Sequence, residues 1–268
     1  MKGEFHIHTT ASDGVLDLKD VLEYVKGKEE YISITDHDIL DNSLLARQIA
    51  KDYGLEAIVG VEVSTCHKGE NVHILAYFND DCELDELNGV LKTIRENRVK
   101  RLYLIKDKLI EHFGIKINID NLLKVSTITR GSIGREIVKE YPEYTTKDIF
   151  DRILCIESPA YVPSTKISSK EAIEIIHRAH GKAVLAHPTL LRKIKPEEII
   201  ELGVDGIEAR YPLNKEGQEE EYRALAKKYN LFVTAGSDFH AFNDSRHGNL
   251  LSTQLTDDDL ERFLKEVL

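Results

Sequence analysis

Short apolar runs alternate with amphipathic helical segments at both ends of the chain, and this alternation constrains the fold more than any other feature. Leu18, Val21, Leu22 and Val25, for example, have the spacing of a helix that buries one face. Such alternation is typical of βα units and a mainly parallel sheet. Strands are expected at 5–8, 31–35, 57–64, 72–78, 183–186, 206–210 and 231–235, with a hairpin turn at 66–71.

The middle of the chain has a different pattern. Residues 83–113 form one long helical stretch rich in Lys and Arg, and shorter helical pieces follow as far as the prolines at 159 and 163. The length of 268 residues suits one large α/β domain with a small insert. The sequence therefore predicts a barrel-like domain built from residues 1–78 and 163–268, with a helical insert at 79–162 that covers the mouth of the barrel.

Composition narrows the partners and the compartment. The formal net charge of −11 argues against sequence-independent binding to duplex nucleic acid, because such binding needs Lys and Arg to neutralise phosphates. A small phosphorylated substrate stays compatible with this charge, since bound metal ions reverse the local field. Three cysteines without CxxC spacing, and the lack of a secretory or membrane-spanning apolar run, predict a cytoplasmic protein that contacts no membrane.

Titratable residues gather at the ends of the expected strands. His6 and His8 are two residues apart, as are Asp238 and His240, so both members of each pair face one side of an extended segment. Burying so many titratable groups without a cation would be costly. Because the carboxyl ends of barrel strands meet on one face, we expect a metal site there. The candidate ligands are His6, His8, Asp13, His37, Glu62, His73, Asp238 and His240, and His187 ends a further strand.

The types of ligand indicate which metals would bind. Imidazoles mixed with carboxylates suit Zn, Mn or Fe better than Ca or Mg. The candidates outnumber the ligands of a single tetrahedral ion, so two or three ions are expected, with Glu62 able to bridge two of them. No glycine-rich phosphate loop, Gly-x-Ser-x-Gly elbow or cysteine nucleophile competes with this interpretation. His247 lies in a loop that could border a cleft.

Six short segments carry these residues in a characteristic order. They are Phe-His-Ile-His-Thr-Thr-Ala-Ser-Asp-Gly at 5–14, Ile-Thr-Asp-His-Asp at 34–38, Gly-Val-Glu-Val at 60–63, Val-His-Ile-Leu at 72–75, Ala-His-Pro at 186–188 and Gly-Ser-Asp-Phe-His at 236–240. With these segments the chain resembles the PHP (polymerase and histidinol phosphatase) superfamily, especially its stand-alone TrpH-like phosphoesterases. The resemblance covers nearly the whole chain except the insert.

The resemblance implies an α/β fold, a distorted (β/α)7 barrel, and a centre of two or three divalent ions. Carried over by position, one ion would be held by His6, His8, Glu62 and Asp238, a second by Glu62 and His73, and a third by Asp13, His37 and His240. His187 would lie near the substrate phosphate as ligand, donor or acid. The implied reaction is hydrolysis of a phosphate ester by a metal-activated hydroxide, without a covalent nucleophile.

One position departs from the family pattern. Ser132 stands in Thr-Arg-Gly-Ser-Ile-Gly-Arg (129–135) where the family places a histidine of the second metal site. A hydroxyl is a poor ligand beside imidazole, so we expect the second position to be empty or partly filled unless Glu136 substitutes. Arg130, and with less support Arg135, are candidates for gripping the substrate phosphate, because a guanidinium fork matches its oxygens.

Three functions are compatible with the resemblance. TrpH-like proteins act on nucleotide phosphates, which favours nucleoside 3′,5′-bisphosphates or short 5′-phosphorylated oligonucleotides as substrates. A histidinol-phosphate phosphatase is the alternative enzyme. A non-catalytic PHP structural module is the third possibility, and the full set of candidate ligands argues against it because such a module could lose any of them.

Overall fold

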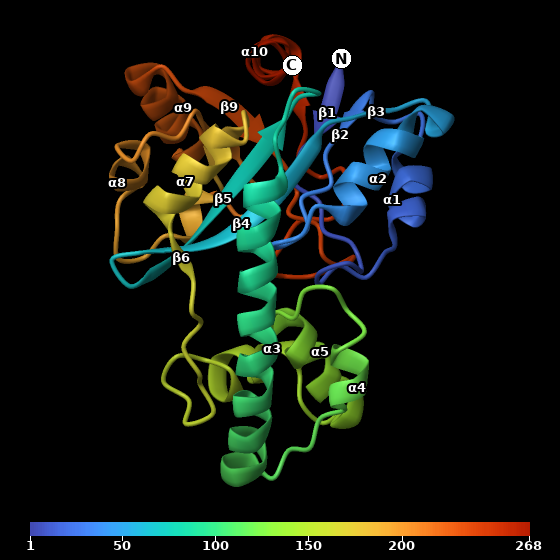
Figure 1. Cartoon of the computed structure of the whole chain (residues 1–268), viewed down its shortest axis with the longest axis vertical. Coiled ribbons are helices and arrows are strands. Elements are labelled where there is room, and N and C mark those ends of the chain that lie inside the picture. The colour runs from blue at the N-terminus through green and yellow to red at the C-terminus, as the bar shows by residue number, and fades with distance from the viewer.

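Two β-sheets form the centre of the protein in the computed structural model, which describes residues 1–268 (Figure 1). The four-stranded sheet has the order β10-β1-β2-β3, and the six-stranded sheet has the order β6-β4-β5-β7-β8-β9. The strands of the first sheet are β1 (Lys2–Glu4), β2 (Tyr31–Ile32), β3 (Glu56–Ala57) and β10 (Leu255–Thr256). Those of the second are β4 (Val59–His67), β5 (Glu70–Phe78), β6 (Ile167–Ser168), β7 (Lys182–Leu185), β8 (Gly206–Arg210) and β9 (Phe232–Ala235).

Two isolated bridges join the two sheets. Isolated parallel bridges join Ile7 to Phe239 and His37 to Glu62, so the extensions of β1 and β2 connect β9 to β4. The succession β4-β5-β7-β8-β9-β1-β2 thus surrounds one face of the protein. Single bridges replace continuous ladders at two joints, and β5 runs antiparallel to both of its neighbours. This arrangement is a strongly distorted barrel and not a closed one.

The expected strand at 5–8 is displaced in the structure. The regular strand β1 ends at Glu4, and the following residues alternate their backbone hydrogen bonds between the two sheets. The Phe5 and His8 amides donate to Ala235 and Phe239, whereas the Ile7 carbonyl accepts from Thr35. This extended segment therefore joins the sheets, and side chains two residues apart along it still point the same way.

Helices cover the outside of the sheets and build a separate lobe. Around the sheets lie α1 (Leu18–Val25), α2 (Asp41–Ile49), α7 (Ser169–Arg178), α8 (Pro196–Ile200), α9 (Gln218–Tyr229) and α10 (Asp257–Val267). The lobe contains α3 (Asp85–Phe113), α4 (Ile119–Leu122), α5 (Arg130–Glu140) and α6 (Thr146–Asp148). Short 3₁₀ helices span Ala50–Tyr53 and Pro188–Leu190, and a π-helical turn spans Ile149–Ile153. None of the helices combines the length and apolar character needed to cross a membrane.

The long helix α3 belongs to both parts of the molecule. Leu87, Leu91 and Ile94 pack into the main apolar core of the sheets, while Leu102 and Ile105 pack into a second core that residues of 102–162 form. Figure 1 shows α3 running out of the α/β body, with α4 and α5 beside its far half and both chain termini at the opposite end of the molecule. The domain limits at 79 and 162 stay a prediction, because α3 joins the two cores without a break.

Candidate metal centre

Histidines and carboxylates from separate segments converge where the barrel strands end. His6 and His8 follow β1 and flank Ile7, whose side chain is fully buried in the core on the other side. Glu62 lies within β4 and His73 within β5. Asp13 lies in a turn after β1, His37 lies after β2 in the isolated bridge to Glu62, and Asp238 and His240 follow β9. The sequence-predicted ligands are therefore brought together from both sheets.

The first group of donors consists of His6, His8, Glu62 and Asp238, all buried. His8 Nε2 lies 3.1 Å from Glu62 Oε2 and 3.1 Å from Asp238 Oδ1. His6 Nε2 lies 3.4 and 3.3 Å from the same two oxygens. These are the four residues that the sequence assigns to one metal position.

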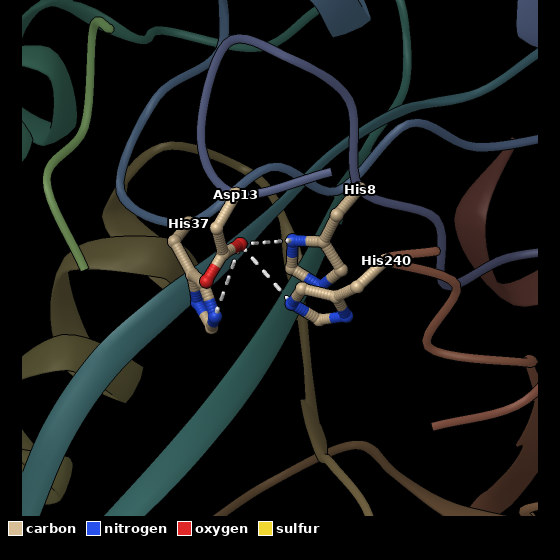
Figure 2. Close-up of side chains that lie close together, drawn as sticks. All are labelled: His8, Asp13, His37 and His240. Carbon is tan, nitrogen blue, oxygen red and sulfur yellow. Dashed lines mark ion pairs between the residues drawn. The ribbon is translucent and has the colours of Figure 1, made fainter. Parts of the chain in front are cut away.

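Asp13 forms the centre of a second group with three histidines. Figure 2 shows its carboxylate pointing between the rings of His8, His37 and His240. Asp13 Oδ1 lies 3.1 Å from His240 Nε2, 3.8 Å from His8 Nδ1 and 4.0 Å from His37 Nε2. The group contains every residue that the sequence assigns to the third position, and His8 in addition.

Glu62 connects these groups to a third one. Its Oε2 atom faces His6 and His8 and lies 3.0 Å from His37 Nδ1. Its Oε1 atom lies 2.8 Å from His73 Nδ1 and 2.9 Å from His187 Nε2. The two oxygens thus face different sets of imidazoles, which is the arrangement that a carboxylate bridging two cations requires.

Buried polar atoms without hydrogen-bond partners show that these residues fit metal ions. Buried polar groups are almost always hydrogen-bonded, so each exception needs an explanation. Six of the twelve exceptions in the chain gather at one place, where imidazole nitrogens and carboxylate oxygens face one another at ligand-like separations. The atoms at this place are His6 Nε2, His8 Nε2, Asp13 Oδ1, His37 Nδ1, Glu62 Oε2 and Asp238 Oδ1. Divalent cations would satisfy all six.

The electrostatics of the centre favour cations. Burial opposes protonation of His8, but Asp238 and Glu62 outweigh burial and raise the pKa of this imidazole to about 10. At His73 burial prevails over Glu62 and lowers the pKa to about 3, so this ring is neutral at pH 7 and free to act as a ligand. The carboxylates around His8 attract a proton strongly, and they attract divalent ions for the same reason. Such ions replace protons on these groups.

Comparison with characterised proteins gives the family. A 5′-3′ exoribonuclease of Haemophilus influenzae is 32% identical over 249 residues, which cover 89% of this chain and 90% of the relative. The chain belongs to the PHP family of metal-dependent phosphoesterases. This membership confirms the resemblance seen in the sequence and the hydrolase class.

Other relatives agree with this PHP assignment. A 3′,5′-nucleoside bisphosphate phosphatase of Chromobacterium violaceum is 28% identical over 253 residues, which cover 89% of this chain and 87% of the relative. The crystal structure of a Bifidobacterium adolescentis protein assigned as a metal-dependent phosphoesterase matches with a TM-score of 0.87 at 25% identity, covering 99% of this chain and 96% of that one. An amidohydrolase of C. violaceum has the same fold, with a TM-score of 0.84 at 24% identity and coverage of 100% of this chain and 98% of that one. No model of a known protein family matches the chain.

The structure gives Ser132 a role in capping a helix. In this PHP chain the Ser132 hydroxyl closes a capping box at the start of α5, where it accepts from the Thr129 amide and donates to the Thr129 carbonyl. Glu136 accepts from Asn121 and lies near Lys139, so it does not substitute as a ligand. The further imidazole beside Glu62 and His73 comes instead from His187, 3.3 Å from His73 Nδ1. The occupancy of the second position stays a prediction.

Arg130 and Arg135, the candidate phosphate-binding arginines of the insert, make few contacts within the chain. Arg130 donates one long hydrogen bond, 3.4 Å, to the Leu154 carbonyl. Burial lowers its pKa, and the nearby Arg246 and Arg98 lower it further. Arg135 makes no ion pair, and it lines an open groove of about 240 Å³ together with Ser132 and Lys139. Neither guanidinium is shown in contact with the candidate ligands, so their substrate roles stay predictions.

Two residues of the centre, Glu208 and Tyr211, were missed in the sequence, and His247, which was expected to border a cleft, also lies there. Glu208 of β8 lies 2.9 Å from His6 Nδ1, and Tyr211 donates to Asp238 Oδ2 at 3.0 Å. His247 stacks on His240 with ring centroids 3.9 Å apart. The Asp244 carboxylate accepts a hydrogen bond from Nδ1 of His247. Glu208 could have been found, because it is an acidic residue embedded in an apolar strand just as Glu62 is. The loop that carries His247 gives no comparable signal.

Proposed function

We propose that this chain hydrolyses phosphate esters of nucleotides, with nucleoside 3′,5′-bisphosphates or short 5′-phosphorylated oligonucleotides as substrates. The observation that carries the proposal is the convergence of six orphaned donor atoms at the end of a PHP barrel. The substrate class is supported by relatives that include an exoribonuclease and a nucleoside bisphosphate phosphatase.

Two or three divalent ions, Mn, Zn or Fe, belong to this proposal. His6, His8, Glu62 and Asp238 would hold the first, and Asp13, His37 and His240 the third. Glu62, His73 and His187 would hold the second. When bound, such ions activate water as a nucleophile near neutral pH and stabilise charge on phosphoryl oxygens.

The residues of the chain itself orient the substrate and exclude water. Arg130 lies among cations without a carboxylate partner, so an incoming phosphate would offset repulsion that the free protein leaves uncompensated. Arg135 would contribute from the groove beside the loop that carries Asp13. The insert would thereby form the side of the cleft that faces the barrel mouth, and a covered site strengthens electrostatic interactions within it.

A substrate panel on metal-analysed protein tests the proposal. The panel compares a nucleoside 3′,5′-bisphosphate, a 5′-phosphorylated dinucleotide, histidinol phosphate and an aryl phosphate. We expect kcat/KM for the nucleotides to exceed that for histidinol phosphate at least tenfold. A preference for histidinol phosphate would contradict the nucleotide assignment, and an inactive protein with intact metal content would favour the structural-module alternative.

A cytoplasmic location is proposed as well, and cell fractionation tests it.

A further inference from the structure

We infer that Glu208 is a positioning residue that couples two neighbouring metal positions through one carboxylate. Its Oε1 atom lies 2.9 Å from His6 Nδ1, and its Oε2 atom accepts from the backbone amide of His187 at 2.7 Å. His6 belongs to the proposed first metal position, and His187 belongs to the proposed second position with Glu62 and His73. Glu208 is fully buried, so no solvent competes for either oxygen. The inference rests on the proposed metal centre.

The first contact selects the tautomer of His6. A carboxylate accepts only, so His6 carries its proton on Nδ1 and leaves the lone pair of Nε2 free. That lone pair faces Glu62 Oε2 and Asp238 Oδ1, at 3.4 and 3.3 Å. Metal-binding histidines usually donate their second ring nitrogen to a carboxylate or carbonyl in this way, and loss of the partner weakens metal binding.

The second contact fixes a strained backbone. His187 has φ +26° and ψ 62°, a left-handed conformation that residues with a Cβ atom rarely adopt. The bond from its amide to Glu208 helps to hold this conformation, which directs the imidazole at Glu62 Oε1, 2.9 Å away. The His6 and His187 rings stack with centroids 5.7 Å apart, so the ring that Glu208 contacts lies beside the ring of the residue whose backbone amide donates to Glu208.

The local structure of β8 places Glu208 at this point. The pairing of β8 with β9 shifts register between Glu208 and Arg210, which marks a β-bulge directly after the glutamate. Bulges of this kind redirect a side chain near a functional site. No other residue of the chain contacts both His6 Nδ1 and the His187 amide.

Replacing the Glu208 carboxylate with an amide tests whether its contacts with His6 and with His187 are both needed. Glutamine accepts at one end and donates at the other, so Glu208→Gln can satisfy His6 Nδ1–H or the His187 amide but not both. Glu208→Asp is one methylene too short to span them. For either variant we expect the dissociation constant of Zn²⁺ at the affected position to rise about 10- to 100-fold, while the Asp13 position keeps its affinity.

Competitive titration of Zn²⁺ against a chelator, with stoichiometry counted per chain, measures this effect. Glu70→Gln is the matched control, because Glu70 is a buried carboxylate that accepts from the amides of Arg192, Lys193 and Ile194 and touches no candidate ligand. We expect the natural protein and Glu70→Gln to retain the same number of ions, and both Glu208 variants to retain fewer at equal free Zn²⁺.

Long-range ¹H–¹⁵N spectra of the natural, Zn²⁺-loaded protein supply a measurement that does not depend on folded variants. His6 should be protonated at Nδ1 and bound to metal through Nε2. Metal bound through Nδ1 would overturn the inference, as would Zn²⁺ affinities of both Glu208 variants within twofold of the natural protein. Failure of the natural protein to retain Zn²⁺ would instead count against the metal centre itself.

Discussion

At the scale of single residues, Asp13 is a buried carboxylate whose charge and orientation are both fixed by its neighbours. Burial raises the pKa of Asp13, but His240 and His37 outweigh burial and hold it well below the usual range. The Thr129 hydroxyl donates to its second oxygen at 2.7 Å and fixes the orientation of the group. The side chain is thus held ionised and aimed at three imidazoles.

We expect Asp13→Ala, His37→Ala or His240→Ala to lower kcat/KM at least a hundredfold. Each change removes a ligand that the proposed third ion requires, and a hundredfold loss corresponds to about 2.7 kcal/mol of transition-state stabilisation. Steady-state kinetics with circular dichroism measures activity and fold together, and His112→Ala on the outer part of α3 serves as the control. Turnover near that of the natural protein in any folded variant would remove that residue from the centre.

Glu29 gives a prediction for stability that is independent of the metal centre. Its side chain is buried, its Oε2 atom has no hydrogen-bond partner, and burial raises its pKa to about 7 despite the opposing charge of Lys2. The folded state therefore binds this proton more tightly than the unfolded state, whose pKa is near the ordinary value of 4.5. The stability that Glu29 contributes is full below about pH 4.5 and is lost as the pH rises through about 7.

Glu29→Gln should consequently be more stable than the natural protein at pH 8, by about 2.5 kcal/mol relative to their difference at pH 5. Gln254, which donates to Glu29 Oε1, can keep a partner in the variant. Urea denaturation at the two pH values measures the difference. An equal effect of the substitution at pH 5 and pH 8 would show that Glu29 does not titrate between them.

At the scale of secondary-structure elements, one arginine anchors the insert helix to the metal face. Arg98 of α3 pairs with Asp38 Oδ2 at 2.5 Å and donates to the Ser64 hydroxyl and to the Ile128 carbonyl. Asp38 directly follows His37, has φ +55° and accepts from the Ser64 amide. A single guanidinium therefore ties together α3, β4, the turn of His37 and the segment before α5.

Arg98→Ala should lower the free energy of unfolding by about 3 to 5 kcal/mol, because it leaves the buried Asp38 carboxylate without its countercharge. Chemical denaturation measures the loss. The control is Lys147→Ala, which breaks an exposed pair with Asp151 and should change stability little. A loss no larger than that of the control would mean that solvent compensates Asp38.

Helices and strands with a clear hydrophobic periodicity were predictable from the sequence. Elements that depend on contacts between distant parts of the chain were not. The helical stretch at 83–113 corresponds to α3, which ends before Gly114 in the left-handed conformation that glycine favours. The hairpin of β4 and β5 also follows from its pattern, with Lys68 and Gly69 at positive φ in the turn. The displacement of β1 was not predictable, because it depends on hydrogen bonds to Ala235 and Phe239 at the far end of the chain.

In the candidate site, too, features set by local spacing were predictable and features set by the surrounding structure were not. His6 and His8 show their common direction through spacing alone, whereas the role of His187 depends on a strained backbone that no local pattern reveals. Ser132 was expected to be a poor ligand, and the local Thr-x-x-Ser spacing (129–132) accounts for its place in a capping box at the start of α5.

At the scale of the whole molecule, the insert brings positively charged side chains together in a protein that is acidic as a whole. The net charge is −11, yet Arg101 and Arg130 lie close enough to repel each other, and burial together with this repulsion lowers the pKa of Arg101 to about 10. Burial, Arg98 and Arg130 lower the pKa of Lys166 to about 7. The sign of the charge thus changes locally where a phosphorylated substrate would enter.

Arg130→Ala should lower kcat/KM for nucleotide substrates about tenfold or more while the metal content stays constant, because one charge-assisted bond to phosphate is lost. Arg152→Ala, at an exposed position of the same insert, is the control. Kinetics and elemental analysis on the same preparations measure both quantities. An unchanged kcat/KM would mean that the insert does not contact the phosphate.

The converging histidines and carboxylates are proposed to hold the ions on which hydrolysis depends. The most direct measurement is phosphate release from a nucleoside 3′,5′-bisphosphate by chelator-treated protein titrated with Mn²⁺. The account predicts negligible release without metal, and recovery that saturates at two to three ions per chain in the natural protein but not in Asp13→Ala. Full phosphate release by metal-free protein, or no release at any Mn²⁺ concentration from folded protein, would contradict it.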